Sequence, residues 1–213
     1  MKLPEKKDDL PISFYKRNTA EVARDLVGKI LIKKINRQWV GGIIVETEAY
    51  LSHGDHASHS HRGITTANSA MFQPAGTLYV YPIHTHRCFN VVTEKNDQGC
   101  AVLIRALEPI WGINQMITLR KTREIRQLAR GPGRLCQSLA INRDHNGQNL
   151  ANCKSIRIAS SKYPAPMITT TKRIGISQDA DLPLRFLHDG NWYVSGRAGD
   201  HHQRPIRPDS VKK

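Results

Sequence analysis

Apolar and polar positions alternate with the two-residue period of a β-strand over several stretches of this 213-residue chain. Residues 29–35 alternate loosely, and turn-forming residues at 36–38 join them to a longer run at 39–50. Further runs predict strands at residues 77–81, 89–93 and 100–107. Between residues 155 and 196, short strands and turns are expected to follow one another, including 156–159 and 192–194. The pattern therefore predicts a sheet-rich fold.

Three short helices are predicted between these strands. The first covers residues 20–27, and Thr19 is its expected cap. Glu108-Pro109 is expected to open the second, because proline is favoured at the first helical position and isoleucines follow at helical spacing. The third covers residues 134–139. Strands and helices together predict one mixed α and β domain.

Composition is that of an ordinary globular protein, with 39% hydrophobic and 23% charged residues. The length fits one domain, expected over residues 11–198, between a flexible N-terminal tail at 1–10 and a basic C-terminal tail at 199–213. Four widely spaced cysteines form no CxxC pair, so free thiols are expected. No apolar run approaches the ~20 residues that span a bilayer, and the charged N-terminus has no signal-peptide core. We therefore expect a soluble, intracellular protein with no membrane partner.

Charge changes this picture, because 32 Lys and Arg against 18 Asp and Glu give a formal net charge of +14. A domain this basic usually meets nucleic acid, an anionic membrane or acidic ligands. The segment 120–130 is rich in cations, and a Gly-Pro-Gly break follows it. Such a run is commonly a solvated helix face, but glycine lets backbone amides approach a phosphate closely. Contacts to a nucleic-acid backbone are therefore expected from Arg130, Gly131, Gly133 and Arg134.

Two carboxylates stand in the predicted strand at residues 39–50. Side chains alternate along a strand, so Glu46, Glu48 and Tyr50 project from one face. Arg105 stands in an otherwise apolar strand and must find an anion, because a guanidinium cannot shed its proton. Its candidate partners are Glu46, Glu48 and a DNA phosphate. Glu48 is therefore either a general base that activates water or a member of a satisfied ion pair.

Tyrosines and histidines are the other candidates for chemistry. Tyr50, Tyr79 and Tyr81 suit either a half-buried core or a platform on which flat bases stack, cationic rings most strongly. The polar loop 52–70 contains four histidines, at positions 53, 56, 59 and 61. Imidazole is a good ligand for zinc or iron, although this spacing matches no known metal motif. A metal-dependent hydrolase built on the His53–His61 loop and a non-catalytic nucleic-acid-binding protein stay as alternatives.

Several strings, taken in their order and spacing, resemble one family, the alkyladenine (3-methyladenine) DNA glycosylases. The similarity extends from about residue 14 to residue 195, and no single string is distinctive by itself. The most telling strings are VETEAY at 45–50, ASHS at 57–60, GTLYVY at 76–81, VLIRALEP at 102–109, GPGRL at 131–135, RIGI at 173–176 and PLRF at 183–186.

The resemblance implies a fold and a reaction. The fold is a single α+β domain in which a curved, mainly antiparallel sheet carries the site, helices surround it and a protruding hairpin near His84 intercalates into DNA. The implied enzyme is a DNA-3-methyladenine glycosylase without lyase activity. It flips alkylated or deaminated purines out of double-stranded DNA and hydrolyses their N-glycosidic bond, which initiates base excision repair. The implied substrates are 3-methyladenine, 7-methylguanine, hypoxanthine and ethenoadenine.

The resemblance also implies how the residues act. Glu48 would activate the attacking water, Arg105 would help to hold that water, and Asn90 would discourage guanine by crowding its exocyclic amine. No metal, lysine Schiff base or other cofactor is implied. A monomer suits a protein that scans DNA, and in a bacterium we expect it in the cytoplasm, associated with the nucleoid.

The base pocket and the DNA wedge follow from the same resemblance. Tyr50 and His59 would pack against one face of the flipped base and Tyr81 against the other, with His59 also reading the base edge. Well-known members carry an aromatic wedge at the hairpin tip, which this chain lacks. Ile83 or His84 is expected to take that role.

Overall fold

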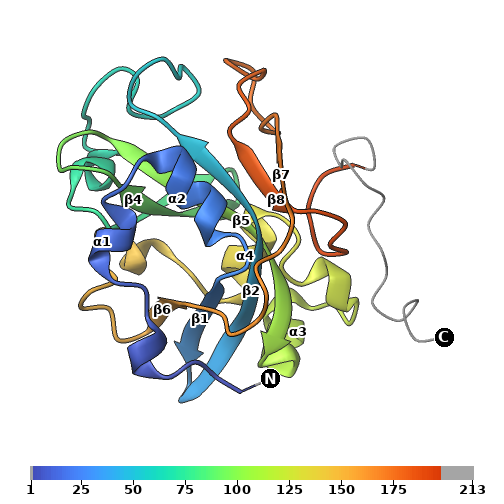
Figure 1. Ribbon diagram of the computed structural model, residues 1–213. Helices are drawn as coiled ribbons and strands as arrows, with labels where there is room; N and C mark the ends of the chain where they lie inside the picture. Colours follow the sequence, from blue (N-terminus) through green and yellow to red (C-terminus); the bar gives the residue numbers. More distant parts are fainter. Residues whose placement is uncertain (1, 198–213) are drawn as a thin grey trace.

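Two long antiparallel strands, β2 (Gln38–Tyr50) and β5 (Cys100–Trp111), run side by side through the middle of the protein (Figure 1). The computed structural model describes residues 2–197. The sheet has the strand order β3-β4-β5-β2-β1-β6, and β8 pairs with both β2 and β7. The other strands are β1 (Ile30–Ile35), β3 (Leu78–Ile83), β4 (His86–Thr93), β6 (Ile156–Ala159), β7 (Ile168–Thr171) and β8 (Arg185–His188). The predicted α+β class and curved, mainly antiparallel sheet are confirmed.

Strand β2 changes its neighbour halfway along one edge. Its first residues pair with β1, and residues 46–48 pair with β8 instead, while β5 follows the opposite edge. Residues 46–48 consequently have a paired strand on both edges, and residues 44–49 are all buried. Two carboxylates lie in this enclosed half of the strand, so the fold itself imposes their burial.

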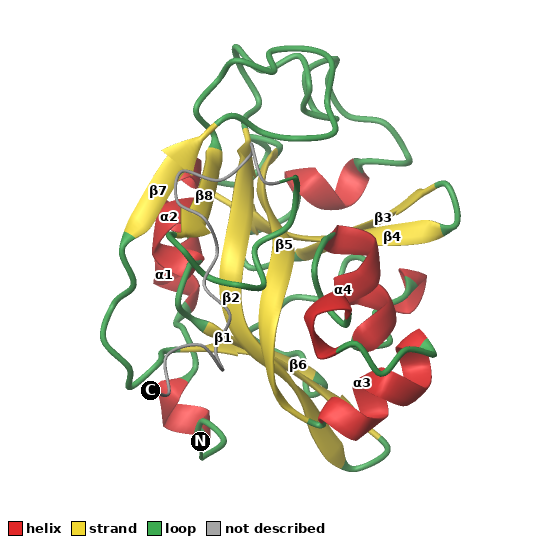
Figure 2. Ribbon diagram, turned by 90° about the vertical axis from the view of Figure 1, so that its right-hand side faces the viewer, coloured by secondary structure: helices red, strands yellow, loops and turns green. Residues whose placement is uncertain are grey.

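Short helices cover the sheet (Figure 2). Helix α2 packs against β2 and β5, whereas α4 packs against β4 and β5. One hydrophobic cluster joins them, with Leu26 of α2, Leu135 of α4 and Ile104 of β5 all fully buried. The helices are α1 (Ile12–Tyr15), α2 (Thr19–Leu26), α3 (Ile113–Arg120) and α4 (Pro132–Ser138), with 3-10 turns at Lys6–Asp8, Ser69–Phe72, Ile125–Gln127 and Arg143–His145.

The predicted helix at Glu108-Pro109 is wrong. β5 continues to Trp111, and helix α3 begins only at Ile113, after Gly112 adopts a left-handed backbone with φ of 68°. Strand β4 pairs only with residues 100–103 of β5, so Pro109 lies where that edge has no β4 neighbour and its missing N–H does not interrupt the β4–β5 ladder. The helix-like isoleucine spacing therefore misled the prediction.

The N-terminal cap of the first predicted helix also differs from expectation. Asn18, not Thr19, caps α2, because its side chain accepts hydrogen bonds from the amides of Ala20 and Glu21. Residues 8–10 lie along β6, where the Leu10 amide donates to the Ile158 carbonyl at 2.9 Å, and the expected tail at 1–10 stays a prediction.

Near the other end of the chain, residues 192–194 form turns rather than the expected strand. The strand of that region is β8, which ends before this segment. The expected basic tail at 199–213 lies outside the described residues.

A close approach between β2 and β5 generates the first testable prediction. A Cβ added at Gly42 would lie 1.8 Å from the Glu108 carbonyl oxygen, which is rigid backbone of the paired strand. We expect Gly42→Ala to lower the free energy of unfolding by about 3 kcal/mol or more, measured by urea denaturation. Gly147→Ala is the control, since its Cβ meets nothing within 4 Å and the left-handed φ of +81° costs about 1–2 kcal/mol. Equal losses in both variants would contradict this packing.

Candidate active site

Two β-bulges place Arg105 between two carboxylates. The β2–β5 register shifts on either side of Glu46, which leaves Val45 on β2 and Arg105 on β5 without a direct partner. One extra residue on each strand restores the register beyond the shifts. Bulges redirect a side chain, and here the Arg105 guanidinium reaches both Glu46 and Glu48.

The contacts of Arg105 are those of a buried ion pair with two acids. Its Nε donates to Glu46 Oε1 at 3.2 Å, and one of its terminal nitrogens donates to Glu48 Oε2 at 3.1 Å. Both carboxylates are fully buried. Burial by itself would lower the pKa of Arg105, but Glu48 and Glu46 outweigh it and raise the pKa above its ordinary value. The guanidinium is therefore permanently charged in this site.

Glu46 anchors this arrangement to the last part of the described chain. It accepts hydrogen bonds from Arg185 Nε at 2.7 Å, from the Ser195 amide at 2.7 Å and from Ser195 Oγ at 3.0 Å. Burial would raise the pKa of Glu46, yet Arg105, Arg185 and Ser195 together hold it below the ordinary value. Glu46 is thus an ionised structural partner that fixes Arg105.

Glu48 lies immediately beneath the site cavity rather than on its wall. Tyr50 Oη donates to Glu48 Oε2 at 2.9 Å, and the Ile174 amide donates to Oε1 at 3.0 Å. The three partners Tyr50, Arg105 and Ile174 all line the cavity, whereas Glu48 does not. Burial, followed by the Glu48 charge, raises the pKa of Tyr50. The hydroxyl therefore stays protonated and donates a hydrogen bond to the Glu48 carboxylate.

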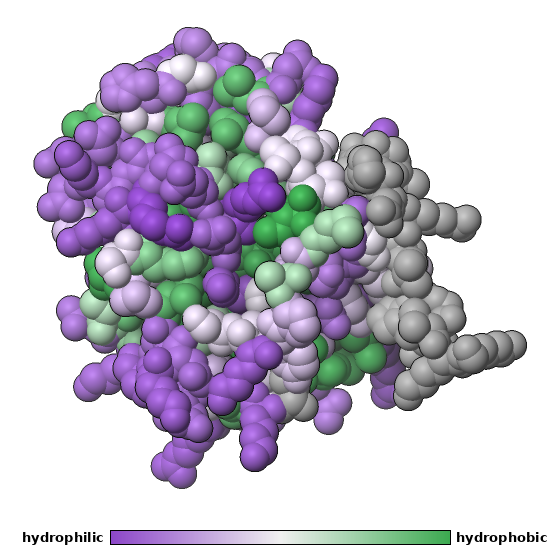
Figure 3. Space-filling view, viewed as in Figure 1, coloured by the Kyte–Doolittle hydropathy of each residue, from purple (hydrophilic) through white to green (hydrophobic). Residues whose placement is uncertain are grey.

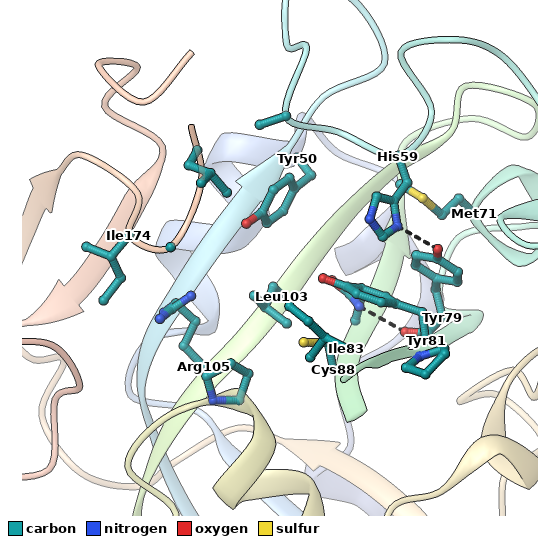
Figure 4. Close-up of a pocket in the computed structure, with 16 residues that line it drawn as sticks. Tyr50, His59, Met71, Tyr79, Tyr81, Ile83, Cys88, Leu103, Arg105 and Ile174 are labelled. Atoms are coloured by element: carbon teal, nitrogen blue, oxygen red, sulfur yellow. Dashed lines mark hydrogen bonds between the residues drawn. The ribbon is translucent and has the colours of Figure 1, made fainter. Parts of the chain in front are cut away.

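The cavity above this network measures about 380 Å³, within the range of ~300–1,000 Å³ for small-molecule sites. Tyr50 and Arg105 lie on one side of it and Tyr81 on the other, with open space between their side chains (Figure 4). Burial raises the pKa of Tyr81 and brings that of Tyr79 to about 12, so these rings are neutral phenols. The result is an aromatic slot, formed by Tyr50 and Tyr81, with a charged floor.

His59 lines the cavity, and the face of a base against which it would pack stays a prediction. Its ring lies edge-on to Tyr81, with ring centres 4.5 Å apart. Its Nδ1 is 2.8 Å from Tyr79 Oη, which fixes the ring against the two tyrosines of β3 (Figure 4). Burial, with His61 as a smaller cause, lowers the pKa of His59, so the neutral imidazole prevails near pH 7. A neutral ring can still donate or accept a hydrogen bond at the cavity.

Asn90 also lies where a bound base would be read. It is buried on β4, lines the cavity, and its Nδ2 donates to the Tyr79 carbonyl at 3.0 Å. This bond holds the side-chain amide in one orientation. The position is compatible with the expected exclusion of guanine, which stays a prediction.

The two candidate wedge residues lie where β3 and β4 turn. Ile83 pairs with His86, and His84 adopts a left-handed backbone with φ of 50° in the two-residue loop between them. Ile83 is 44% exposed and also lines the cavity. These strands extend away from the rest of the sheet beside α4 (Figure 2). Entry of this tip into DNA stays a prediction.

The expected backbone-binding residues divide into two groups. Arg130 is half-buried, and its guanidinium donates to the carbonyls of Val194 at 2.9 Å and Gly196 at 2.6 Å. Arg134 is exposed, and open space surrounds Gly131, where an added Cβ would meet nothing within 4 Å. The assignment of all four residues to DNA contact stays a prediction, and the structure favours Arg134 and Gly131 for it.

The histidines of the loop 52–70 have separate partners. His56 Nδ1 is 2.9 Å from Asp179 Oδ2, and His61 Nδ1 is 2.8 Å from the Ser58 carbonyl. Within residues 2–197, no three His, Cys, Asp or Glu side chains lie close enough together to hold a metal ion. The same part of the chain has no helix long and apolar enough to span a membrane.

The sequence reasoning did not find Asp55, Arg173, Arg185 and Ser195. Asp55 and Arg173 form a bidentate ion pair beside Tyr50, and Arg185 and Ser195 hold Glu46. The sequence did contain a signal for two of them, because Arg173 and Arg185 stand in two of the strings that carry the family resemblance.

Figure 3 shows hydrophobic residues in the middle of one face of the protein, with hydrophilic residues to the left of them and below.

Comparisons with known proteins show what the chain is similar to. A family model described as methylpurine-DNA glycosylase (MPG) matches residues 13–192. A relative from Rhodopirellula baltica is 52% identical over 204 residues, which cover 93% of this chain and 87% of the relative. Relatives from Methanoculleus marisnigri and Carboxydothermus hydrogenoformans are 46% and 45% identical, over 88% and 87% of this chain and 99% and 98% of their own lengths. All three carry 3-methyladenine DNA glycosylase in their names.

An aromatic slot above a buried carboxylate–arginine network, on a curved antiparallel sheet, together with these matches, defines a DNA glycosylase. The chain belongs to the methylpurine-DNA glycosylase family, because the family model spans most of its length and several relatives exceed 40% identity.

Three histidines generate a prediction about pH. His145 is buried, His188 is half-buried and His59 is packed against tyrosines at a more exposed position. Desolvation is the main cause that lowers the pKa of all three in the folded protein. Below the ordinary histidine pKa of about 6.5, the unfolded chain therefore binds protons that the folded chain excludes. The stability that these histidines contribute is fully present above that value and is lost as the pH falls through their folded-state pKa. The melting temperature therefore drops on acidification.

Melting temperatures between about pH 5 and pH 8 test this effect. His145→Gln should flatten the pH dependence, while His53→Gln, at an exposed position of the loop 52–70, is the matched control. A melting temperature that rises on acidification, or an equal change in both variants, would contradict it.

Proposed function

We propose that this protein flips alkylated or deaminated purines out of duplex DNA and hydrolyses their N-glycosidic bond, leaving an abasic site. The observation that carries the proposal is the position of the Tyr50–Tyr81 slot directly above the Glu48–Arg105 pair. A slot of this kind accepts a flat base between two rings, and the charged floor can reach the sugar carbon to which that base is attached.

The aromatic walls suit the expected lesions. 3-Methyladenine and 7-methylguanine carry a positive charge, which the faces of neutral tyrosines attract. Such cationic bases leave easily and need little acid catalysis. Hypoxanthine and ethenoadenine are neutral and need more assistance at the leaving group, for which the cavity-lining His59 imidazole is a candidate. Flipping costs least at damaged or mispaired bases, which adds selectivity.

The proposed reaction uses one water molecule beside the Glu48–Arg105 pair. Each carboxylate oxygen has two lone-pair positions, and among the described residues Glu48 Oε1 accepts a hydrogen bond from the Ile174 amide alone. The remaining position can accept a proton from the water as its oxygen attacks C1′ of the sugar. The C1′–N bond breaks and its electron pair stays with the departing base. A charged Arg105, which donates to Glu48 Oε2, would orient the water.

DNA would be held from the side of the hairpin and α4. The basic face near Gly131 and Arg134 suits phosphates, while the tip at residues 83–84 suits insertion into the base stack. Arg130 would act indirectly, by fixing the chain near Val194 and Gly196.

Base release from defined duplexes tests the proposal. Wild-type protein should convert 7-methylguanine, hypoxanthine or ethenoadenine in matched duplexes to alkali-labile sites, measured in single turnover with enzyme in excess. Glu48→Gln should lower the rate by about 10²–10⁴-fold, because it removes the general base. Binding to the lesion-containing duplex should survive.

Glu108→Gln is the matched control, because this carboxylate on the same sheet accepts a hydrogen bond from Asn191 and does not line the cavity. It should release bases at the native rate. Native-rate release by Glu48→Gln would overturn the mechanism, and strong DNA binding without any base release by the wild type would leave a non-catalytic binder.

The hairpin tip generates a separate prediction. Ile83→Ala should slow excision of neutral hypoxanthine more than that of 7-methylguanine, because a weaker wedge leaves the flipped state less populated. His84→Ala, measured in parallel, decides which of the two residues is the wedge. Ile64→Ala is the control, since Ile64 is an exposed isoleucine of the loop 52–70. Hypoxanthine rates that are equal to wild type in both hairpin variants would exclude a wedge at this tip.

A further inference from the structure

A second buried ion pair lies beside the slot and takes no part in the proposed chemistry. Arg173 and Asp55 form two parallel hydrogen bonds of 2.7 Å each, and both side chains are fully buried. A bidentate pair of this kind fixes geometry as well as charge. It joins residues that are 118 positions apart in the chain.

This pair ties three segments of the cavity wall together. Arg173 also donates to the Ala49 carbonyl at 3.1 Å, at the end of β2. Asp55 accepts from the Leu51 amide at 2.9 Å and from the Ala57 amide at 3.2 Å, so it organises the loop that carries His59. The end of β2, this loop and the segment 173–176 consequently meet at one point.

The Arg173 guanidinium lies against the ring of Tyr50. Its central carbon is 4.7 Å from the ring centre, in a cation–π contact. Tyr50 and the two residues after Arg173, Ile174 and Gly175, line the cavity (Figure 4). Arg173 does not line it, so this side chain can act on a bound base only through its neighbours.

Stability alone explains this pair poorly. The desolvation of two buried charges commonly costs as much free energy as their mutual attraction contributes. In addition, Arg173 Nε is buried and has no hydrogen-bond partner among the described residues, which is a further cost. An arrangement with these costs gains more from fixing the position of a neighbouring group than from stabilising the fold.

We propose that Arg173, clamped by Asp55, is a positioning residue that holds the Tyr50 ring at the spacing needed to receive a base. The inference rests on the proposed function and adds to it a residue outside the slot. Because Arg173 acts through Tyr50, its contribution disappears when the Tyr50 ring is removed. A merely structural residue would contribute equally with and without that ring.

A double-mutant cycle tests this dependence. Single-turnover release of 7-methylguanine is measured for wild type, Arg173→Gln, Tyr50→Ala and the double variant; this base leaves easily, so slow rates stay measurable. Arg173→Gln should slow release by about tenfold or more in the native background, since small displacements in a site are costly. In the Tyr50→Ala background, the same substitution should change the rate by less than about threefold.

Two further variants keep the test decisive if Arg173→Gln folds poorly. Arg173→Lys retains the charge but cannot make the bidentate pair, so a partial loss with the same dependence on Tyr50 is expected. Arg157→Gln is the matched control, because it breaks the Arg157–Asp9 ion pair on β6, where the bonded atoms are 2.6 Å apart. It should lower the melting temperature without changing base release.

The outcomes separate the two proposals. If wild-type protein releases no 7-methylguanine or other lesion, the proposed function fails. If it does, and Arg173→Gln slows release equally in both backgrounds, or not at all, the positioning role is overturned while the function stands.

Discussion

The buried network of Glu46, Glu48, Arg105 and Arg185 is the constraint on which the rest of the structure depends. Two carboxylates and two guanidiniums balance in charge, but each loses its solvation, so every member needs all of its partners. That requirement explains why β2 exchanges β1 for β8 at Glu46, since β8 delivers Arg185 there. It also explains the paired bulges, which aim Arg105 without shifting the register beyond them.

The four-residue network beneath the slot contains charged groups but has no net charge. The slot above it therefore need not favour one charge state of the base strongly. The attraction for a cation comes from neutral tyrosine faces, whose protons burial retains. A net negative floor would bind cationic bases tightly in the ground state, yet tight ground-state binding alone does not accelerate the reaction. In a network of balanced charge, the individual charged groups can instead interact with the water and the sugar carbon, where charge develops during bond cleavage.

The sequence predicted the parts of the site that follow from strand alternation or from a lone charge in an apolar strand. Alternation along residues 45–50 put Glu48 and Tyr50 on one face, and an arginine inside an apolar strand demanded an acid, as the structure confirms. Asp55–Arg173 and Glu46–Arg185 join positions 118 and 139 residues apart, and no periodicity reports such pairs. The helix predicted at Pro109 and the cap predicted at Thr19 failed for a different reason. There, local preference was overridden by strand pairing in one case and by side-chain geometry in the other.

The candidate wedge and the slot belong to one mechanical unit. Tyr79, Tyr81 and Ile83 alternate along β3 and all line the cavity, so the exposed tip is two residues from the slot wall on the same face. The end of β4 next to this tip packs closely on α4, because a Cβ on Gly133 of α4 would lie only 2.9 Å from the His86 side chain. The tip residue Ile83 and the slot residue Tyr81 therefore share one strand, and α4 supports that strand through its β4 partner. The proposed wedge and the proposed base slot consequently depend on the same structural element.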